Sequence, residues 1–185
     1  MARRFKALSE SDLDAAQQAV YRSIVSGPRG GARGPFNALL RSPELADHTQ
    51  KLGAYVRFKS SLPAKLNEIA ILVTARYWSA QYEWYAHAQL AEKAGLGKGL
   101  ISSIEKNLRP EGMTKEETAI YNFSKELHEK KEVGDATFAA VKDLFGEKGI
   151  IDLVGACGYY TFVSMVLNVE RHPLPDGKPD PLKKI

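Results

Sequence analysis

A carboxylate and an imidazole are spaced along one expected helix so that they can exchange a proton. Glu83 and His87 are four residues apart within the segment 81–87. On a helix they lie on one face, one turn apart. Carboxylate and imidazole groups commonly move protons near neutral pH. The spacing therefore indicates acid–base chemistry, with His87 as the general acid or base.

A second carboxylate, Glu68, interrupts a run that is otherwise apolar from Leu66 to Val73 apart from Asn67. Such a carboxylate either faces the surface or is held in a site. We expect Glu68 to orient His87 or relay its proton, and Glu83 to raise the pKa of His87 or act as a second acid. The alternative is that Glu83 and His87 form only an exposed pair, worth about 0.2–0.5 kcal/mol.

Helical periodicity and helix-end signals recur along the chain, and no β pattern of comparable length appears, so the expected class is all-α. Thr114 and Glu117 form a capping box, Ser42 and Asp135 are expected caps, and Gly95 is a stop signal. The expected helices span 12–26, 42–59, 63–78, 81–94, 97–106, 114–127, 135–145 and 150–169.

These helices suit one domain over residues 1–185. Residues 1–34 would form an N-terminal helix and a glycine-rich loop, and the proline-rich stretch 170–185 an extended C-terminal arm. The segment 150–169 is apolar on nearly all sides, which is typical of a central buried helix or a helix at an oligomer interface.

The glycine-rich loop 27–35 carries Arg29 and Arg33, and Arg41 follows shortly after it. An arginine fork here could hold a substrate carboxylate under a closing lid. The alternative is solvated charge on a flexible connector. A phosphate-binding role is weak, because the loop lacks the GK[ST] motif and follows no strand.

Composition limits the classes of function. The 185 residues are 44% hydrophobic and 26% charged, with a net charge of +4. This mild charge lacks the dense Lys/Arg clustering of a nucleic-acid binder. No apolar run approaches the roughly 20 residues that span a membrane, and the first residues lack an apolar core typical of a secretory signal. We therefore expect a cytoplasmic protein with no membrane or nucleic-acid partner.

Cysteine and histidine usage bears on redox and metal chemistry. Cys157 is the single cysteine, so an intrachain disulfide, a CxxC pair and a cysteine zinc cluster are impossible. Its small neighbours predict a buried, inert thiol. Di-iron bundles use Glu-x-x-His, whereas Glu83 and His87 have one more residue between them, and the other histidines are scattered. We expect no metal.

The ordered motifs resemble the carboxymuconolactone decarboxylase family, which includes the alkyl hydroperoxidase D proteins. The resemblance covers about residues 27–168. The segments that carry it are 41–45 (RSPEL), 62–68 (LPAKLNE), 83–87 (EWYAH) and 158–160 (GYY), with Asn168. It implies an all-α fold that assembles into homotrimers or hexamers with sites near subunit contacts.

The resemblance also separates two branches. Aligning the peroxidase pattern Cys-x-x-Cys-x-x-x-His on His87 places its cysteines at Ala80 and Glu83, and its upstream glutamate at Glu68. The acid–base pair matches, but both redox cysteines are absent, and a dithiol cycle needs them. The sequence is thus similar to the decarboxylase branch, where acid–base groups act without metal or organic cofactor.

We therefore expect a cofactor-independent decarboxylase or isomerase that acts on a small anionic lactone or organic acid. The expected catalytic residues are His87, Glu68 and Glu83. The expected substrate contacts are Arg41, Trp84, Tyr159 and Asn168. Core packing is the alternative role of the aromatic residues, including Tyr82, Tyr85 and Tyr160, and internal hydrogen bonding is that of Asn168.

Two other functions stay open at this point. The first is a peroxidase-like antioxidant activity that uses Cys157 across subunits. The second is a non-catalytic oligomer that binds a small ligand, with the arginine loop and the C-terminal arm contacting partners.

Overall fold

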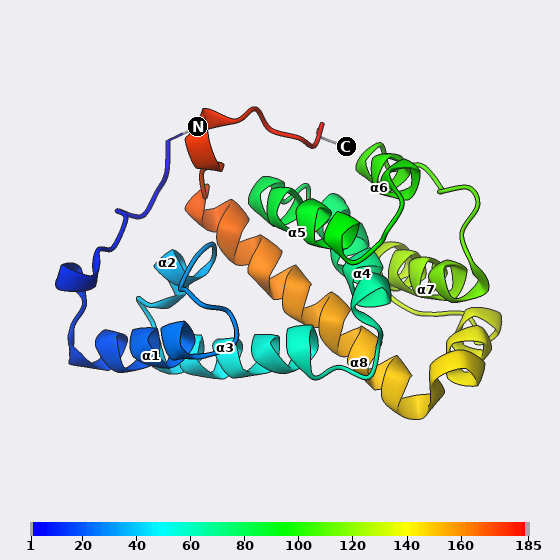
Figure 1. The fold of residues 1–185 in the computed structure, drawn as a ribbon, viewed down its shortest axis with the longest axis horizontal. Helices are drawn as coiled ribbons and strands as arrows, with labels where there is room; N and C mark the ends of the chain where they lie inside the picture. The colour runs from blue at the N-terminus through cyan, green and yellow to red at the C-terminus, as the bar shows by residue number, and fades with distance from the viewer. Residues whose placement is uncertain (1, 184–185) are drawn as a thin grey trace.

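The computed structural model describes residues 2–183, and within that range all regular structure is helical (Figure 1). The expectation of an all-α fold is confirmed. The elements are η1 (Glu10–Asp12), α1 (Ala15–Ser26), α2 (Phe36–Leu39), α3 (Pro43–Phe58), α4 (Ala64–Tyr77), α5 (Gln81–Lys93), α6 (Lys98–Glu105), α7 (Lys115–Lys130), α8 (Asp135–Glu170) and η2 (Pro175–Gly177).

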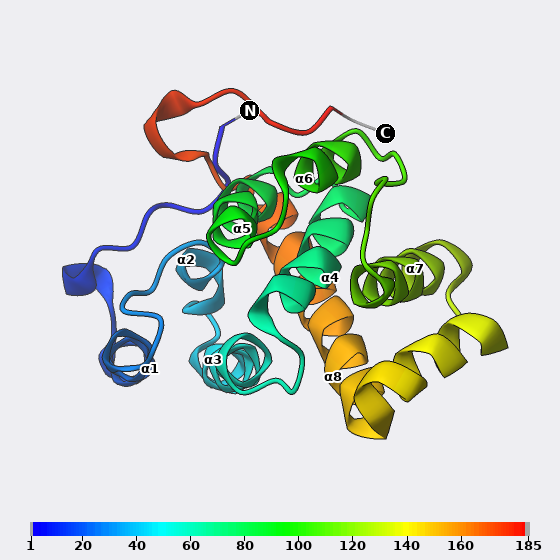
Figure 2. The same cartoon turned by 45° about the vertical axis from the view of Figure 1, so that its right-hand side comes forward.

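The core forms around α4, which packs against α5, α7 and α8 (Figures 1 and 2). Every α4 residue from Leu66 to Arg76 is buried. Ile69 and Ile71 point to nearly opposite sides of the helix and both are 0% exposed, so α4 buries apolar area on all sides rather than along one stripe. A helix enclosed in this way is a rigid support for any polar side chain that it carries.

The element α8 consists of two helical parts separated by a sharp bend, as the two expected helices at 135–145 and 150–169 predict (Figure 2). Gly146 between them has φ 66° and ψ −176°, a conformation that residues with a Cβ rarely adopt. By length and hydropathy alone α8 is able to cross a membrane, contrary to the expectation from sequence. Its most apolar window is 56% buried by neighbouring helices, as in the core helix of a globular domain, so it is weak evidence for a membrane span.

The helix ends follow the sequence signals with two corrections. Thr114 Oγ1 accepts a hydrogen bond from the Glu117 backbone at 3.2 Å, and Glu117 Oε2 accepts one from the Thr114 backbone at 2.9 Å, so the capping box is confirmed. The cap at Asp135 is wrong, because Gly134 is the capping residue of α8. Ser42 precedes α3 but its hydroxyl caps no backbone amide, and Pro43 at the first position already removes one donor.

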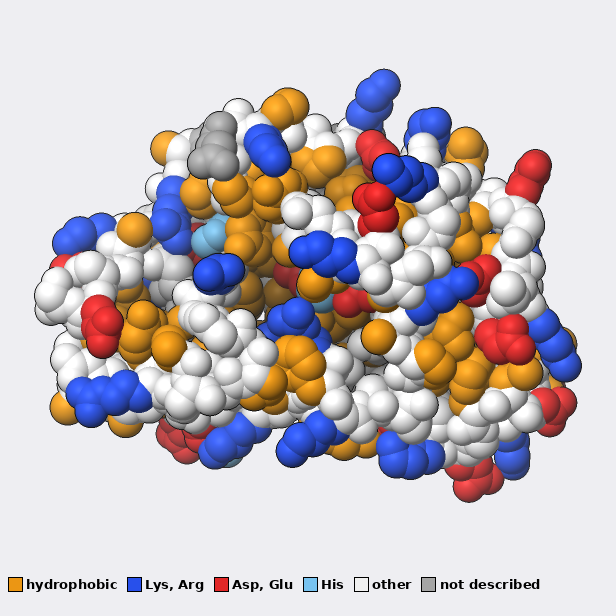
Figure 3. Space-filling view, in the orientation of Figure 1, with side chains coloured by type: hydrophobic (Ala, Val, Ile, Leu, Met, Phe, Trp, Pro, Cys, Tyr) orange, Lys and Arg blue, Asp and Glu red, His pale blue; other side chains and the backbone are white. Residues whose placement is uncertain are grey.

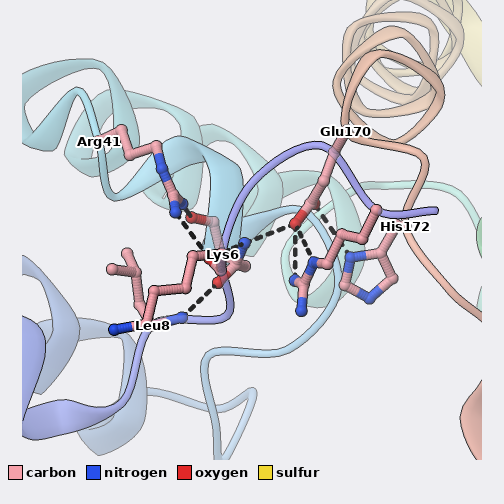
Figure 4. Close-up of polar contacts among 7 residues, drawn as sticks. Lys6, Leu8, Arg41, Glu170 and His172 are labelled. Carbon is pink, nitrogen blue, oxygen red and sulfur yellow. Dashed lines mark hydrogen bonds and ion pairs between the residues drawn. The ribbon is translucent and has the colours of Figure 1, made fainter.

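The N-terminal segment packs against the C-terminal end of α8. The carboxylate of Glu170 is fully buried and accepts hydrogen bonds from Arg3 Nη2 at 2.6 Å and Asn37 Nδ2 at 2.5 Å (Figure 4). His172 Nδ1 lies 3.0 Å from its other oxygen. The C-terminal arm continues over α5, where Gln81 exchanges two hydrogen bonds of 2.8 Å with the backbone of Leu182.

A buried carboxylate also fixes the connection from α3 to α4. Asp152 on α8 accepts hydrogen bonds from Tyr55 Oη at 2.9 Å, from Ser61 N at 2.7 Å and from Lys148 Nζ at 2.8 Å. Burial opposes its ionisation, but these donors together hold the pKa of Asp152 well below its usual range. The network sets the direction in which the chain enters α4.

We predict that Asp152→Asn lowers the free energy of unfolding by about 1–3 kcal/mol, since hydrogen bonds to a charged acceptor are lost and buried donors are left unpaired. Urea denaturation at pH 7 measures the change. Asp143→Asn, at an exposed position on the same helix, is the matched control and should change stability by less than about 0.5 kcal/mol. Equal stability of the two variants would contradict the role given to Asp152.

Candidate functional site

A short connection between α4 and α5 brings the three predicted proton-transfer residues together. Only residues 78–80 separate the two helices, and Ser79 takes a left-handed conformation with φ 46°. The helices pack side by side (Figure 2), so Glu68 on α4 lies opposite His87 on α5. Glu83 lies in the first turn of α5, where the helix dipole favours a negative charge.

The three side chains form a continuous hydrogen-bonded row. His87 Nδ1 lies 2.7 Å from Glu68 Oε2, and His87 Nε2 lies 3.0 Å from Glu83 Oε1. The exposed fractions are 9% for Glu68, 4% for Glu83 and 5% for His87, so the alternative of an exposed surface pair is excluded. We call these residues the proton row.

The charge on the proton row is set by two opposing effects. Burial on its own would lower the pKa of His87, because it penalises the charged imidazolium. The negative charges of Glu68 and Glu83 and their hydrogen bonds outweigh that penalty and raise the pKa of His87 to about 9. At neutral pH the imidazolium donates from both nitrogens, one to each carboxylate.

The proton row forms one wall of a cavity of about 250 Å³. Glu83 and His87 line it directly, and Tyr160 from α8 stands edge-on to the His87 ring with centroids 4.9 Å apart. Figure 3 shows acidic and histidine side chains at the bottom of a hollow on this face, between basic side chains. The other lining residues are Arg29, Gly31, Arg33, Gly34, Pro35, Phe36, Arg57, Tyr82, Ala86, Leu90, Tyr159 and Val163.

The four predicted substrate contacts are placed differently from one another. Tyr159 lines the cavity, whereas Arg41, Trp84 and Asn168 do not. Trp84 is 3% exposed and packs in the main core, and Asn168 Nδ2 donates to the Trp78 carbonyl at 2.9 Å. Arg41 holds the N-terminal arm, because it donates to the Lys6 carbonyl at 2.7 Å (Figure 4). Its guanidinium also stacks on the Phe5 ring.

The cationic part of the cavity comes from other arginines. Arg29 and Arg33 come from the glycine-rich loop, and Arg57 comes from the last turn of α3. Substrate binding by Arg29 and Arg33 was one of the two alternatives that the sequence left open. Sequence reasoning missed Arg57. Arg57 lies four residues after Gly53 and therefore on the same face of the helix. That spacing indicates a site residue only once the glycine-rich loop is known to lie over this face.

Neither ring nitrogen of His87 is free to bind a metal ion, because each is hydrogen-bonded to a carboxylate. In the described part of the chain, no three histidine, cysteine, aspartate or glutamate residues are arranged to hold one. The geometry suits proton transfer along a hydrogen-bonded row.

Cys157 is placed where thiol chemistry is disfavoured. The side chain is 1% exposed, and its Sγ lies 3.6 Å from Ser124 Oγ. Burial raises the pKa of the Cys157 thiol to about 11, so the thiolate nucleophile is scarce at neutral pH.

A second cavity of about 220 Å³ lies between α4, α6 and α7, and its histidine behaves in the opposite way. Burial, together with the charges of Lys131 and Lys125, lowers the pKa of His128 to about 4. His128 Nε2 is 2.8 Å from Thr74 Oγ1 and forms no carboxylate contact within the described residues. It is a neutral core histidine.

Comparison with known proteins places the fold. A peroxidase-related protein from Ralstonia eutropha JMP134, described as an alkylhydroperoxidase AhpD core, superposes with a TM-score of 0.76 over 94% of this chain and 93% of its own. An Agrobacterium tumefaciens protein of unknown function, a candidate antioxidant defence protein AhpD, superposes with a TM-score of 0.65 over 77% of this chain and 99% of its own. Both are 16% identical to this sequence.

The chain has the alkyl hydroperoxidase D fold. This confirms the fold that the resemblance seen in the sequence implied. No protein-family model and no curated protein matches the sequence. At 16% identity the structural likeness shows the fold, while the reaction has to be argued from the site.

The proton row should make stability depend on pH. The folded pKa of His87, about 9, exceeds its ordinary value of 6.5, so protonation stabilises the fold. This contribution is complete below about pH 6.5, is lost as the pH rises through 9, and is of the order of 3 kcal/mol. We predict that His87→Gln removes this decrease, as measured by denaturant unfolding at pH 6, 7.5 and 9.

The comparison between wild type and variant isolates His87 from other titrating groups. His48→Gln, at an exposed position, is the control and should keep the wild-type pH dependence. Parallel pH profiles for wild type and His87→Gln would contradict the charge assigned to the proton row.

Proposed function

We propose that this protein is an enzyme that transfers protons on a small anionic organic acid or lactone, in a reaction of the carboxymuconolactone decarboxylase type. The observation that carries the proposal is the buried proton row at the wall of a cavity that also has three arginines. A proton source and cationic groups on one cavity suit a reaction that develops negative charge on carbon.

In the decarboxylation, the bond between the carboxylate carbon and its neighbour breaks and CO₂ leaves, so the electron pair stays on the substrate as a dienolate. Arg29 and Arg57 stabilise that charge. The imidazolium of His87 then supplies a proton, which reaches one carbon of the dienolate through the carboxylate of Glu83 that lines the cavity. Glu68 and Glu83 hold the ring in place, and solvent returns a proton to His87 through the row.

The names of the structural neighbours suggest a peroxidase instead. Ala80 and Glu83 stand where the resemblance places the redox cysteines, and Cys157 is buried with a raised pKa. A thiol peroxidase needs an accessible thiolate. The chemistry of these residues therefore favours acid–base catalysis over the peroxidase alternative.

We also propose that copies of the chain associate, as the resemblance implies for homotrimers or hexamers. Ile151 and Val169 on α8 are 68% and 54% exposed, and Leu52 on α3 is 50% exposed. Large exposed apolar side chains on two helices support a contact with another chain. Light scattering in solution measures the mass of the assembly.

We predict that His87→Ala and Glu68→Ala each reduce turnover of 4-carboxymuconolactone by about a hundredfold or more, because the proton donor or its orienting partner is lost. Product analysis with purified protein measures turnover, and circular dichroism checks folding. His48→Ala, an exposed histidine, should retain the wild-type rate. Wild-type turnover in a folded His87→Ala protein would refute the proposal.

The pH profile provides a separate prediction. The acid form of His87 is the proton donor and its pKa is about 9, so turnover should persist through neutral pH and fall on the alkaline side with an apparent pKa near 9. A rate that rises through pH 9 would show that His87 acts as a base.

A prediction about Cys157 separates the two reaction classes. Cys157→Ser should leave turnover of 4-carboxymuconolactone within about twofold of wild type, since the buried thiol takes no part in proton transfer. Peroxide consumption by wild type that is lost in Cys157→Ser would instead support the peroxidase alternative.

A further inference from the structure

The second cavity, between α4, α6 and α7, is separate from the cavity of the proton row (Figure 2). Of the residues that the structure describes, none lines both. Its volume of about 220 Å³ exceeds the roughly 150 Å³ of an engineered apolar cavity that binds benzene, so one substituted aromatic ring has room in it. The uncharged side chains on its wall are Val73, Tyr77, Ile104, Asn107, Tyr121 and His128.

The hydrogen bonds of Thr74 fix which nitrogen of His128 carries the proton. Thr74 Oγ1 donates its only proton to the Ala70 carbonyl at 2.8 Å. It can therefore only accept from His128 Nε2, which also lies 2.8 Å away. Nε2 carries the proton of the neutral ring, and Nδ1 carries a lone pair. The structural contact of His128 with α4 uses Nε2, so Nδ1 is left as a hydrogen-bond acceptor.

This acceptor can be reached by a molecule in the cavity. Nδ1 has no hydrogen-bond partner among the described residues, and it is not one of the unpaired side-chain atoms that are fully buried. His128 lines the cavity, one face of its ring stacks on Tyr77 with centroids 5.0 Å apart, and Nε2 is turned toward Thr74. Nδ1 is thus the polar atom that the ring offers to a ligand.

The cavity also has an entrance. It continues into a groove along α7, because Asn107, Tyr121, Lys125 and Glu129 line both. At this entrance Lys125 Nζ donates to Asn107 Oδ1 at 3.1 Å and forms an ion pair with Glu129. The side chains of Lys125 and Glu129 are 24% and 50% exposed, so solvent reaches the entrance.

The charges near His128 decide which hydrogen-bond donor fits. Burial and then the positive charges of Lys131 and Lys125 lower the pKa of His128, and Arg76 adds a further positive charge to the wall. These charges disfavour an ammonium donor. A carboxylate has no proton to donate, and its lone pairs would meet the lone pair of Nδ1. A neutral hydroxyl group on an aromatic ring meets both conditions.

We infer that the second cavity binds a small phenol, whose hydroxyl group donates a hydrogen bond to His128 Nδ1. The ring of the phenol lies against Val73, Ile104 and Tyr121. We call these four residues the phenol site. Its ligand is neutral, unlike the anionic acid of the proposed function, and no residue of the proton row takes part. The phenol site therefore goes beyond the proposed function and is tested independently of it.

The first test titrates the full chain, labelled with a nitrogen isotope in its histidine rings, with phenol at pH 7.5 and records nitrogen NMR spectra. The signal of His128 Nδ1 should shift saturably, while the ring signals of His87 should not move. Toluene has the same shape without a donor and should bind at least about threefold more weakly. In a cavity without an acceptor the order is opposite, because phenol loses its hydrogen bonds to water.

A variant tests the acceptor itself. His128→Phe removes Nδ1 and keeps an aromatic ring at this position. It should reverse the preference, so that toluene binds at least about threefold more tightly than phenol. A merely structural role of His128 would weaken both ligands together and leave their order unchanged. Thermal unfolding checks that the variant is folded.

A second pair of variants locates the bound phenol. Ile104→Phe places a larger side chain in the second cavity and should weaken phenol binding about tenfold or more. Leu90→Phe narrows the cavity of the proton row instead, so it is the matched control and should keep the phenol affinity of wild type within about twofold.

Three results overturn the phenol site. They are the absence of a saturable shift of His128 Nδ1, tighter binding of toluene than of phenol by wild type, and loss of phenol binding in Leu90→Phe but not in Ile104→Phe. If Ile104→Phe and His128→Phe do not fold, the wild-type titration decides alone, because it distinguishes His128 from His87 and phenol from toluene.

Discussion

The burial of one imidazole between two carboxylates is the interaction around which this domain is organised. Removing three ionisable groups from water is unfavourable unless each meets its partner at hydrogen-bond distance. His87 meets Glu68 at 2.7 Å and Glu83 at 3.0 Å, which requires α4 and α5 to hold a fixed register. The full burial of α4 by α5, α7 and α8 provides that rigidity, so the helix that is buried on all sides also carries the carboxylate of Glu68.

The two buried histidines show that burial alone does not decide the chemistry. His128 forms no ion pair with a carboxylate in the described structure, and burial outweighs the charge of Glu129 and lowers its pKa to about 4. Burial acts in the same direction on His87, yet Glu68 and Glu83 raise its pKa to about 9. One fold thus contains a neutral structural histidine and a charged one at a cavity. The pKa values of the two histidines differ because of the two carboxylates beside His87 and not because of how deeply each ring is buried. This supports a functional role for the proton row.

The sequence was sufficient for the proton row and for most of the helices, because helical spacing and short connections are local properties. Glu83 and His87 share a face through their spacing, and the three-residue connection makes α5 fold back on α4. Arg41, Trp84 and Asn168 could not be placed, since each depends on contacts between distant segments. The position of Arg41 depends on its contacts with the N-terminal arm. The need for a glycine at position 53 depends on how the loop residue Arg29 and the α8 residue Tyr159 pack against α3.

Position 83 is where this sequence departs from the peroxidase pattern in a way that bears on the charge of the site. In the peroxidase branch of the family that the sequence resembles, a cysteine would stand at this position, in the first turn of a helix and next to the histidine. A carboxylate there keeps the negative charge that the helix dipole and the imidazolium favour, but it has no sulfur to oxidise. The electrostatic arrangement is retained while the redox step is lost. What remains is a row that can hold and donate a proton, and the residues across the cavity, from the loop and α3, then decide which molecule receives it.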